Sequence, residues 1–534
     1  MKKRLLAVLT AAVLGVSALV LPLSGCNSNT AYEGDYGLNI ITLKKGYGTE
    51  WLEALADEME EMYPGITIVI KTEVVDTNIT NKLDAGEGYC EWDLFFGGTD
   101  FRSYIKTTMD GSNVVLADLS DIYANPASEE ETIIVEDKLD DSLLSSFQNE
   151  NAAGETKYYT MPWTQGINGL LVNNEVVAGA LGADWRETYP CRTTEEWMDL
   201  LDALAGEGEY SFIYAAGQQY YQTLYNVWWT QYEGLEGIEN YYSGMAYNVT
   251  TDRMELSPLI FEQDGRYAAM DVMESIMKDP YVYPKSTGIE WDAMQTYFMA
   301  GEAAMLPNGD WTNIEMGKSF PDNDVQFMRV PIVSALGEKL GITEDELRAA
   351  VSYADALLDG ETATKPVLAP KEVNGVTLTA DEVLQEVYDA RCVVDTYANL
   401  HTVCAAAWSP RLEYAKAFLK LMASDKGQEI YAEAMDGNTS LPYGYDISTC
   451  DWFASTSEFA KTRYELAKNA TYYYRHAELP LGNDLLAWRA VYSAPIEHCL
   501  YSLGWSGDDV VKEDINYYKT GTRWTDLLKK AGLR

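Results

Sequence analysis

The sequence has few positive charges for its length of 534 residues. Only 39 lysines and arginines stand against 83 aspartates and glutamates, which gives a formal net charge of −44 at pH 7. A field of this sign repels phosphate backbones, so we expect neither nucleic acid nor an anionic lipid surface as a partner. Apolar residues still make up 47% of the chain. The acidity therefore belongs to the surface of a folded protein rather than to a disordered tail.

Histidine and cysteine are also scarce. The three histidines, His401, His476 and His498, lie far apart and form neither an HExxH motif nor paired-cysteine spacing, so ordinary partly buried histidines fit better than zinc ligands. The seven cysteines show no repeating spacing, and a chain of this length needs no disulfide framework. If any two pair, we expect Cys392 and Cys404. We expect no metal and no other cofactor.

Long apolar runs are absent after the N-terminus. Three basic residues precede an apolar run from residue 5 to 23, and Leu-Ser-Gly-Cys ends at Cys26. This arrangement resembles a bacterial lipoprotein signal, which implies removal of residues 1–25 and a lipid on the Cys26 thiol. The alternative is an uncleaved spanning helix, because the run approaches the roughly 20 residues that such a helix needs. We expect residues 26–37 to form a flexible tether.

Strand and helix patterns alternate along the first part of the chain. An apolar strand over 38–43 precedes a helical pattern that begins at Trp51, and alternating isoleucines over 66–70 predict the next strand. This alternation is typical of an α/β protein. Two capping boxes, which begin at Thr343 and Thr379, predict a helical insertion over 334–400.

Four segments in a fixed order carry a family resemblance. They are KYYTMPWTQGINGLLVNN (157–174), WDAMQTYFMAGEAAMLPNGDW (291–311), QFMRVPIV (326–333) and residues 408–442. Together they resemble the extracellular solute-binding proteins of carbohydrate ABC transporters, the maltose-binding-protein-like superfamily. In that family such segments form the first crossing between two lobes, the helix and strand before a tryptophan-bearing ligand loop, the strand that leads back, and paired helices. The insertion over 334–400 and the sequence Val-Asn-Asn at 172–174 depart from the family pattern.

The resemblance implies a two-lobed α/β fold, each lobe a sheet flanked by helices, joined by hinge crossings near Pro162, Arg329 and Leu441. The implied N-lobe comprises 38–160 and 330–438 with the insertion, and the C-lobe comprises 163–325 and 440–534. The implied function is that of a lipid-anchored monomer at the extracytoplasmic face of the membrane. It captures an oligosaccharide without transforming it and delivers it to the permease subunits of an ABC importer. An exported glycoside hydrolase, which needs two suitably spaced carboxylates, and the same fold with a peptide or other solute are the alternatives.

A sugar site needs flat aromatic rings for stacking and polar side chains for hydroxyl groups. The resemblance places Asn308, Asp310 and Trp311 in the ligand loop, with Trp311 either a stacking platform or a core indole. The other candidates are Trp163, Tyr47, Lys44, Glu50, Asp100, Trp228, Trp229, Tyr443 and Trp505. For Glu50 a role at the helix N-terminus is equally compatible, and for Asp100 a turn cap is the simpler interpretation. Of the adjacent Trp228 and Trp229, whose side chains point about 100° apart on a helix, one could face the cleft.

Overall fold

The computed structural model describes residues 31–98, 101–373, 376–474, 476, 479–482, 484–485 and 496–533. Cys26 and Asp100 lie outside these residues. We expected 31–36 to belong to a flexible tether, but these residues lie against the first lobe. The Tyr32 N–H donates to Asn39 Oδ1 at 2.9 Å, and Arg411 Nη1 donates to the Tyr32 carbonyl at 2.7 Å. This part of the tether prediction was wrong, because an arginine distant in sequence supplies a partner for the backbone here.

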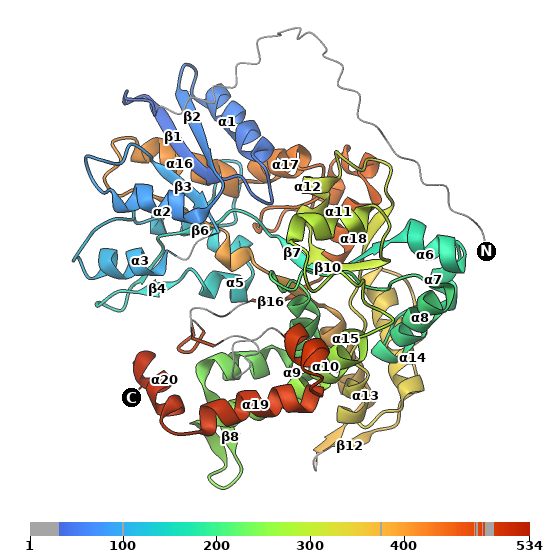
Figure 1. Ribbon diagram of the computed structural model, residues 1–534. Helices are drawn as coiled ribbons and strands as arrows, with labels where there is room; N and C mark the ends of the chain where they lie inside the picture. The colour runs from blue at the N-terminus through green and yellow to red at the C-terminus, as the bar shows by residue number, and fades with distance from the viewer. Residues whose placement is uncertain are drawn as a thin grey trace.

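The first lobe contains a five-stranded sheet in the order β2-β1-β3-β15-β6. These strands are β2 (Thr67–Glu73), β1 (Gly37–Leu43), β3 (Leu94–Gly97), β15 (Thr402–Ala405) and β6 (Met161–Pro162). β1 is buried along its whole length and pairs in parallel with both β2 and β3. Its helices include α1 (Glu50–Met62), α16 (Leu412–Ala423) and α17 (Asp425–Ala434). Figure 1 shows α16 and α17, which come late in the chain, beside the sheet that the N-terminal strands form.

The second lobe contains the other five-stranded sheet, in the order β10-β7-β14-β16 with β11 also paired to β7. These strands are β10 (Met305–Gly309), β7 (Ile167–Asn173), β14 (Val393–Thr396), β16 (Thr471–Tyr473) and β11 (Val325–Met328). The long helix α9 (Gln222–Ser243) packs on β7, β10, β14 and β16, while α18 (Glu458–Ala467) packs on β11. Each lobe has its own hydrophobic core, so the boundary between them is the place where polar and aromatic groups from both lobes meet.

Shorter elements complete the two lobes. Before the first crossing lie α2 (Asp76–Asp84), α3 (Arg102–Met109), α4 (Ser120–Tyr123), α5 (Asp141–Ser145), β4 (Asn149–Glu150) and β5 (Thr156–Lys157). After it lie α6 (Asn174–Leu181), α7 (Trp185–Thr188), α8 (Thr194–Glu207), β8 (Met245–Asn248), β9 (Arg253–Leu256), α10 (Asp264–Ile276), α11 (Trp291–Met299), α12 (Trp311–Met316), α13 (Ala335–Lys339), α14 (Glu344–Leu358), β12 (Lys371–Val373), β13 (Val376–Leu378), α15 (Ala380–Arg391), α19 (Gly507–Lys519) and α20 (Arg523–Lys530).

The insertion over 334–400 belongs to the second lobe, and our assignment of it to the N-lobe was wrong. Its strand β14 pairs with β7 and β16, and Leu347 and Val387 lie in the second hydrophobic core. The expected hinge at Arg329 was wrong for the same reason, because the chain returns to the first lobe only at 397–401. The two predicted capping boxes are confirmed at the starts of α14 and α15. The apolar faces of α14 and α15 pack on the second lobe. The sequence signals for these two helices are local, so they do not specify the lobe on which the helices pack.

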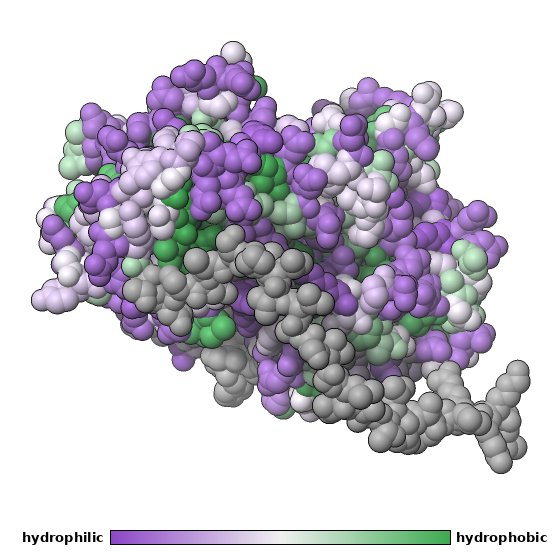
Figure 2. All heavy atoms as spheres, turned by 90° about the horizontal axis from the view of Figure 1, so that it is seen from above, coloured by the Kyte–Doolittle hydropathy of each residue, from purple (hydrophilic) through white to green (hydrophobic). Residues whose placement is uncertain are grey.

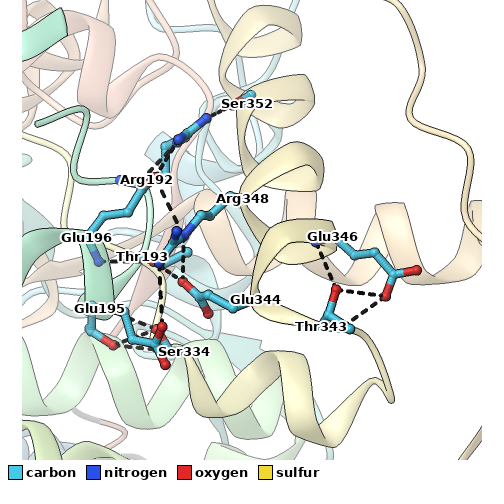
Figure 3. A network of polar contacts seen from close by, with 11 residues as sticks. Arg192, Thr193, Glu195, Glu196, Ser334, Thr343, Glu344, Glu346, Arg348 and Ser352 are labelled. Carbon is cyan, nitrogen blue, oxygen red and sulfur yellow. Dashed lines mark hydrogen bonds and ion pairs between the residues drawn. The ribbon is translucent and has the colours of Figure 1, made fainter. Parts of the chain in front are cut away.

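A polar network fastens the insertion to α8 (Figure 3). Arg192 Nε donates to Glu196 Oε2 at 2.9 Å, and Arg192 Nη1 donates to Ser352 Oγ of α14 at 2.8 Å. Arg348 Nε lies 3.1 Å from Glu344 Oε1 and 3.6 Å from Glu196 Oε1. Carboxylates of α8 and α14 thus share two arginines, which balances most of the charge at the contact.

The outer surface and the thiols agree with the composition. Hydrophilic residues make up most of the face seen in Figure 2, as the net charge of −44 suggests. None of the helices in the described part of the chain has the length and apolar character needed to cross a bilayer.

Cys392 and Cys404, our expected pair if any formed, are both buried free thiols, and the other four described cysteines are also free.

If the insertion is an integral part of the second lobe, its buried side chains must contribute to global stability. Leu347 of α14 is fully buried, whereas Leu357 of the same helix is 44% exposed. We predict that Leu347→Ala lowers the free energy of unfolding by about 2 to 5 kcal/mol, because it leaves a cavity in the core. The matched change Leu357→Ala should cost less than about 1 kcal/mol. Urea unfolding measures both; equal small effects would mean that the insertion folds independently.

Candidate functional site at the lobe boundary

Two turns meet across the boundary between the lobes. β1 ends at Leu43 and the turn over 44–49 leads into α1, while β10 ends at Gly309 directly before α12. Tyr47 Oη, from the first turn, donates to Asp310 Oδ1 at 3.2 Å. The Gly46 N–H donates to Glu315 Oε1, also at 3.2 Å. The structure therefore brings together Tyr47 and Asp310, which are 263 residues apart in the chain.

Aromatic rings from both lobes surround this contact. Tyr47 lies edge-on to Trp163, Trp311 and His401, with ring centroids 5.7, 6.3 and 5.3 Å away. On the second-lobe side, Tyr220 lies 5.4 Å from Trp311. We call Tyr47, Trp163, Tyr220, Trp311 and His401 the interlobe aromatic cluster. Rings with polar edges at a boundary of this kind are suited to stacking on the apolar faces of a solute.

Trp311 occupies the centre of this cluster. Its ring lies directly on the backbone of Gly309, where an added Cβ would come within 1.9 Å of Trp311 Cζ3, so only glycine fits at that position. The side chain is 8% exposed, because Tyr47 and Tyr220 cover it in this arrangement. A solute could therefore reach the ring only after the lobes separate. The assignment of Trp311 as a stacking platform stays a prediction.

Asp310 is fully buried and has three kinds of neighbour. In addition to Tyr47, the N–H of Ile167 donates to Asp310 Oδ2 at 3.3 Å. Arg463 Nε lies 3.4 Å from the same oxygen. Burial raises the pKa of the Asp310 carboxyl to about 6, despite the opposing effect of the Arg463 charge. Most of the hydrogen-bonding capacity of this carboxylate is used inside the protein, and its role in holding a solute stays a prediction.

Asn308 differs from Asp310 because its polar atoms lack partners. It is fully buried on β10 opposite Gly169, and neither its Oδ1 nor its Nδ2 has a hydrogen-bond partner among the described residues. An unsatisfied buried amide costs about 1 to 3 kcal/mol. Gln295, also fully buried, has an unpartnered Oε1 and donates from Nε2 to Glu315 Oε2 at 3.0 Å. These amides remain available to hydroxyl groups or water.

A groove of about 770 Å³ lies between the lobes beside the cluster. Lys44 and Glu50 line it from the first lobe, and α12 with the segment after it lines it from the second. Glu50 accepts from Lys318 Nζ at 3.0 Å across the groove, which is a use that the sequence did not indicate. On the same side, Lys45 Nζ lies 4.7 Å from the ring centroid of Trp291. Charged groups of both signs therefore bridge the lobes here.

Four of the predicted site residues lie elsewhere. Trp228 and Trp229 are both fully buried in the second core, and their indole N–H groups donate to the Pro331 carbonyl and to Gln263. The expectation that one of the pair faces the cleft was wrong, because α9 is buried on all sides along this stretch. Tyr443 is buried and donates to the Pro162 carbonyl at 2.8 Å. Trp505 packs against the second-lobe core.

Sequence reasoning missed several groups at the boundary. Tyr220 precedes α9 without a distinctive motif, and Glu315 is one of many carboxylates in an acidic chain. His401 is a partly buried histidine, as expected, and it also belongs to the aromatic cluster. Burial lowers its pKa to about 4. Among the described residues, no cluster of three or more His, Cys, Asp or Glu side chains could hold a metal ion.

Asp395 is a further buried carboxylate that the sequence did not identify. It lies on β14, where Thr223 Oγ1 donates to its Oδ2 at 2.6 Å and Asn168 Nδ2 donates at 3.3 Å. Burial raises its pKa to about 7, and no cation is among the groups that shift it. The polar cluster of Asp395, Asn168 and Thr223 lies at the end of the sheet that faces the boundary, where Asn168 is opposite Gly309.

Comparison with known proteins identifies the fold. A sequence model of the family described as bacterial extracellular solute-binding protein matches residues 45–337, which is more than half of the chain. Among curated proteins, no match was found. Solved structures with the same fold include the solute-binding protein RafE in complex with raffinose, with a TM-score of 0.51 and 15% identity, covering 90% of this chain and 98% of RafE.

Two further structures are similar to the same extent. The GacH receptor of Streptomyces glaucescens, solved unliganded and with acarbose, has a TM-score of 0.51 and 14% identity, covering 92% of this chain and 99% of GacH. The substrate-binding protein Lmo0181 from Listeria monocytogenes, solved with cycloalternan, has a TM-score of 0.52 and 12% identity, covering 93% and 99%. At these identities the likeness concerns the fold alone.

The raised pKa of Asp395 predicts how stability depends on pH. Because the folded-state pKa of about 7 lies above the usual value of 3.8, the folded protein binds this proton more tightly, and its stability falls as the pH rises through 7. The loss should approach about 3 to 4 kcal/mol at pH 8. Asp395→Asn removes the titration and should therefore unfold at a higher temperature than wild type at pH 8, with a smaller difference at pH 5. Asp57→Asn, an exposed position on α1, is the control; a difference independent of pH would contradict the assignment.

Proposed function

The chain belongs to the bacterial extracellular solute-binding proteins, and we propose that it captures an oligosaccharide between its two lobes and delivers it to the permease subunits of an ABC importer. The observation that carries the proposal is the interlobe aromatic cluster, which lies where the two lobes meet and has hydrogen-bonding side chains beside it. Stacking rings next to carboxylates and amides match the alternation of C–H faces and hydroxyl groups on a sugar. The extracytoplasmic location follows from the family.

Solved relatives support the choice of sugar over other solutes. The structures of similar fold include proteins described with raffinose, acarbose and cycloalternan and a chitin oligosaccharide binding protein. Fold alone does not choose a ligand, so the weight of the proposal rests on the chemistry of the boundary. We propose that the sugar stacks on Trp311 after the lobes open and that Asn308 and Gln295 accept or donate hydrogen bonds to its hydroxyl groups. Lobe closure around the bound sugar is the state that the transporter recognises.

We propose that the protein binds this sugar without transforming it and acts as a monomer. The two buried carboxylates nearest the boundary, Asp310 and Asp395, are each engaged by neighbouring donors, which suits a structural role better than the paired acid and nucleophile of a glycoside hydrolase. Long incubation with a bound glycan should return the glycan intact. Appearance of shorter products that one carboxylate substitution abolishes would move the assignment to the hydrolase.

The first test is a thermal-shift screen against a panel of raffinose, maltodextrins, chitin oligosaccharides and xylo-oligosaccharides. A ligand at 100 times its dissociation constant should add about 2.7 kcal/mol to the stability of the folded state. Trp311→Ala should weaken binding of the selected glycan about 30-fold to 1000-fold, which corresponds to roughly 2 to 4 kcal/mol for a buried hot spot. Calorimetric titration measures this loss.

Two further variants serve as controls for that titration. Trp311→Phe keeps an aromatic ring and should bind the glycan with an intermediate affinity. It can be measured in place of Trp311→Ala if the alanine variant does not fold. Trp505→Ala, which removes an indole packed on the second-lobe core, should leave the affinity unchanged. If Trp311→Ala folds and binds as tightly as wild type, Trp311 does not contact the solute.

We also propose that Cys26 becomes the N-terminal residue and carries the lipid anchor, which would hold the protein at the outer face of the cell membrane. The Leu-Ser-Gly-Cys sequence after an apolar run supports this proposal. Cys26→Ala should release the protein from the membrane fraction, and intact-mass analysis of wild type should find an acylated N-terminal cysteine. A Cys26→Ala protein that still partitions into the membrane would favour the uncleaved helix.

A further inference from the structure

The chain segments that join the two lobes are hydrogen-bonded to one another. The Gln165 N–H of the first crossing (163–166) donates to the Ser440 carbonyl of the third crossing (439–442) at 2.7 Å. The hydroxyl groups of Thr164 and Thr439, from the same two crossings, lie 3.0 Å apart. The second crossing (397–401) joins the first because the Trp163 N–H donates to the His401 carbonyl at 3.1 Å. Rotation of one lobe against the other must therefore bend these segments together.

One buried arginine contacts two of these crossings. Arg463 of α18 is 1% exposed. Its Nη2 donates to the Gln165 carbonyl at 2.7 Å, and its Nη1 donates to Ser440 Oγ at 2.9 Å. The same guanidinium places Nε 3.4 Å from Asp310 Oδ2. A planar group with five donors in fixed directions can hold three such partners at once, whereas a lysine ammonium cannot reproduce that geometry.

Asp310 extends the contact to the opposite lobe. Its Oδ2 faces Arg463 while its Oδ1 accepts the hydrogen bond from Tyr47 Oη of the first lobe. The three side chains therefore form a continuous series from the crossings, through the junction of β10 and α12 beside Trp311, to the first lobe. Each member is at least 98% buried, so solvent does not weaken these electrostatic contacts as it would on the surface.

We propose that Arg463 is a positioning residue that, through Asp310 and Tyr47, sets the equilibrium between the open and the closed arrangement of the lobes. Lobe opening breaks the Tyr47 contact and leaves the Asp310 carboxylate with one partner fewer, so this contact favours the closed arrangement. The solute reaches Trp311 only after the lobes separate, so its apparent affinity depends on the population in which the lobes are open. This consequence rests on the proposed function, whereas the effect on the lobes of the solute-free protein does not.

The variants that test the proposal remove one contact at a time. Tyr47→Phe loses only the hydroxyl group, and Arg463→Lys keeps the charge but loses the fork of donors. Both should give the solute-free protein a larger radius of gyration in small-angle scattering. Because the solute reaches Trp311 only after the lobes separate, both should also bind the glycan found in the screen more tightly, by up to roughly tenfold, the usual effect of a hydrogen bond to a charged group.

Matched controls separate positioning from a general loss of stability. Tyr123→Phe removes another buried hydroxyl, which donates to the Thr160 carbonyl at 2.8 Å within the first lobe. Arg411→Lys alters another buried pair, in which Nε lies 2.8 Å from Asp93 Oδ2. Both controls should lower the melting temperature and leave the radius of gyration of the solute-free protein unchanged.

The radius of gyration measured against pH is a further test, because a purely structural role of Arg463 and Asp310 would not make it depend on pH. The groups that face Asp310 are Tyr47, Arg463 of α18, Tyr431 of α17 and Tyr472 of β16, and burial raises the pKa of all three tyrosines, so none of them changes charge between pH 5 and 7. Burial raises the pKa of Asp310 to about 6. Because burial in the closed arrangement raises this pKa, proton uptake favours that arrangement, so the radius of gyration of the solute-free wild type should fall from pH 7 to pH 5. Asp310→Asn should lose this part of the pH dependence, while any part that comes from Asp395 should remain.

The outcomes distinguish this inference from the proposed function. If Tyr47→Phe and Arg463→Lys both have the radius of gyration of wild type, the inference is wrong, whatever their affinities. If Arg463→Lys does not fold, Tyr47→Phe alone decides the matter. If the variants open but no glycan binds wild type, the inference stands and the sugar assignment fails.

Discussion

The hydrogen bond between Tyr47 and Asp310 joins two lobes whose hydrophobic cores are built on different sheets, and Trp311 of the second lobe packs into the core of the first. The arrangement of the lobes depends on the few groups that meet at this boundary and on the three crossings. A buried carboxylate is a costly group to place there, because desolvation opposes its charge. The neighbouring Arg463 and the Ile167 N–H offset part of that cost. The boundary is consequently a specific contact rather than a general apolar surface.

This constraint explains the distribution of aromatic residues. Trp163 is fixed in the first lobe, where it stacks on Trp51 at 5.1 Å and donates from its indole to the Gly97 carbonyl. Trp311 is fixed in the second lobe by close contact with Gly309. Tyr47 touches both rings, so its position depends on whether the lobes are together. A solute that replaced Tyr47 on the face of Trp311 would couple its own binding to the same movement.

Much of the fold could be predicted from the sequence because the relevant signals are local. The alternation of strands and helices predicted an α/β protein, and the threonine and glutamate pairs at Thr343 and Thr379 located two helix starts. The lobe that receives the insertion could not be predicted, because α14 and α15 carry apolar faces that would fit either sheet. The burial of Trp228 and Trp229 depends likewise on which elements cover α9. The local sequence around two adjacent residues does not specify those elements.

The candidate site was predicted in part for the same reasons. The turn that contains Tyr47 follows β1, and α12, which begins at Trp311, follows β10. Strand ends at a lobe boundary are where binding residues gather. The contact between these two segments across the boundary depends on the tertiary structure, so the sequence did not predict it. Arg463 had no sequence signal at all, because one arginine on an amphipathic helix resembles any surface residue, and only the fold places it against two crossings.

The proposed function requires that one solute engages both lobes at the boundary. Hydrogen–deuterium exchange measured with and without the glycan selected by screening tests it most directly. The glycan should slow exchange together in the turn over 44–49 of the first lobe, in β10 and α12 of the second, and in the crossings at 163–166 and 439–442. Protection confined to one lobe, with the crossings unaffected, would contradict it.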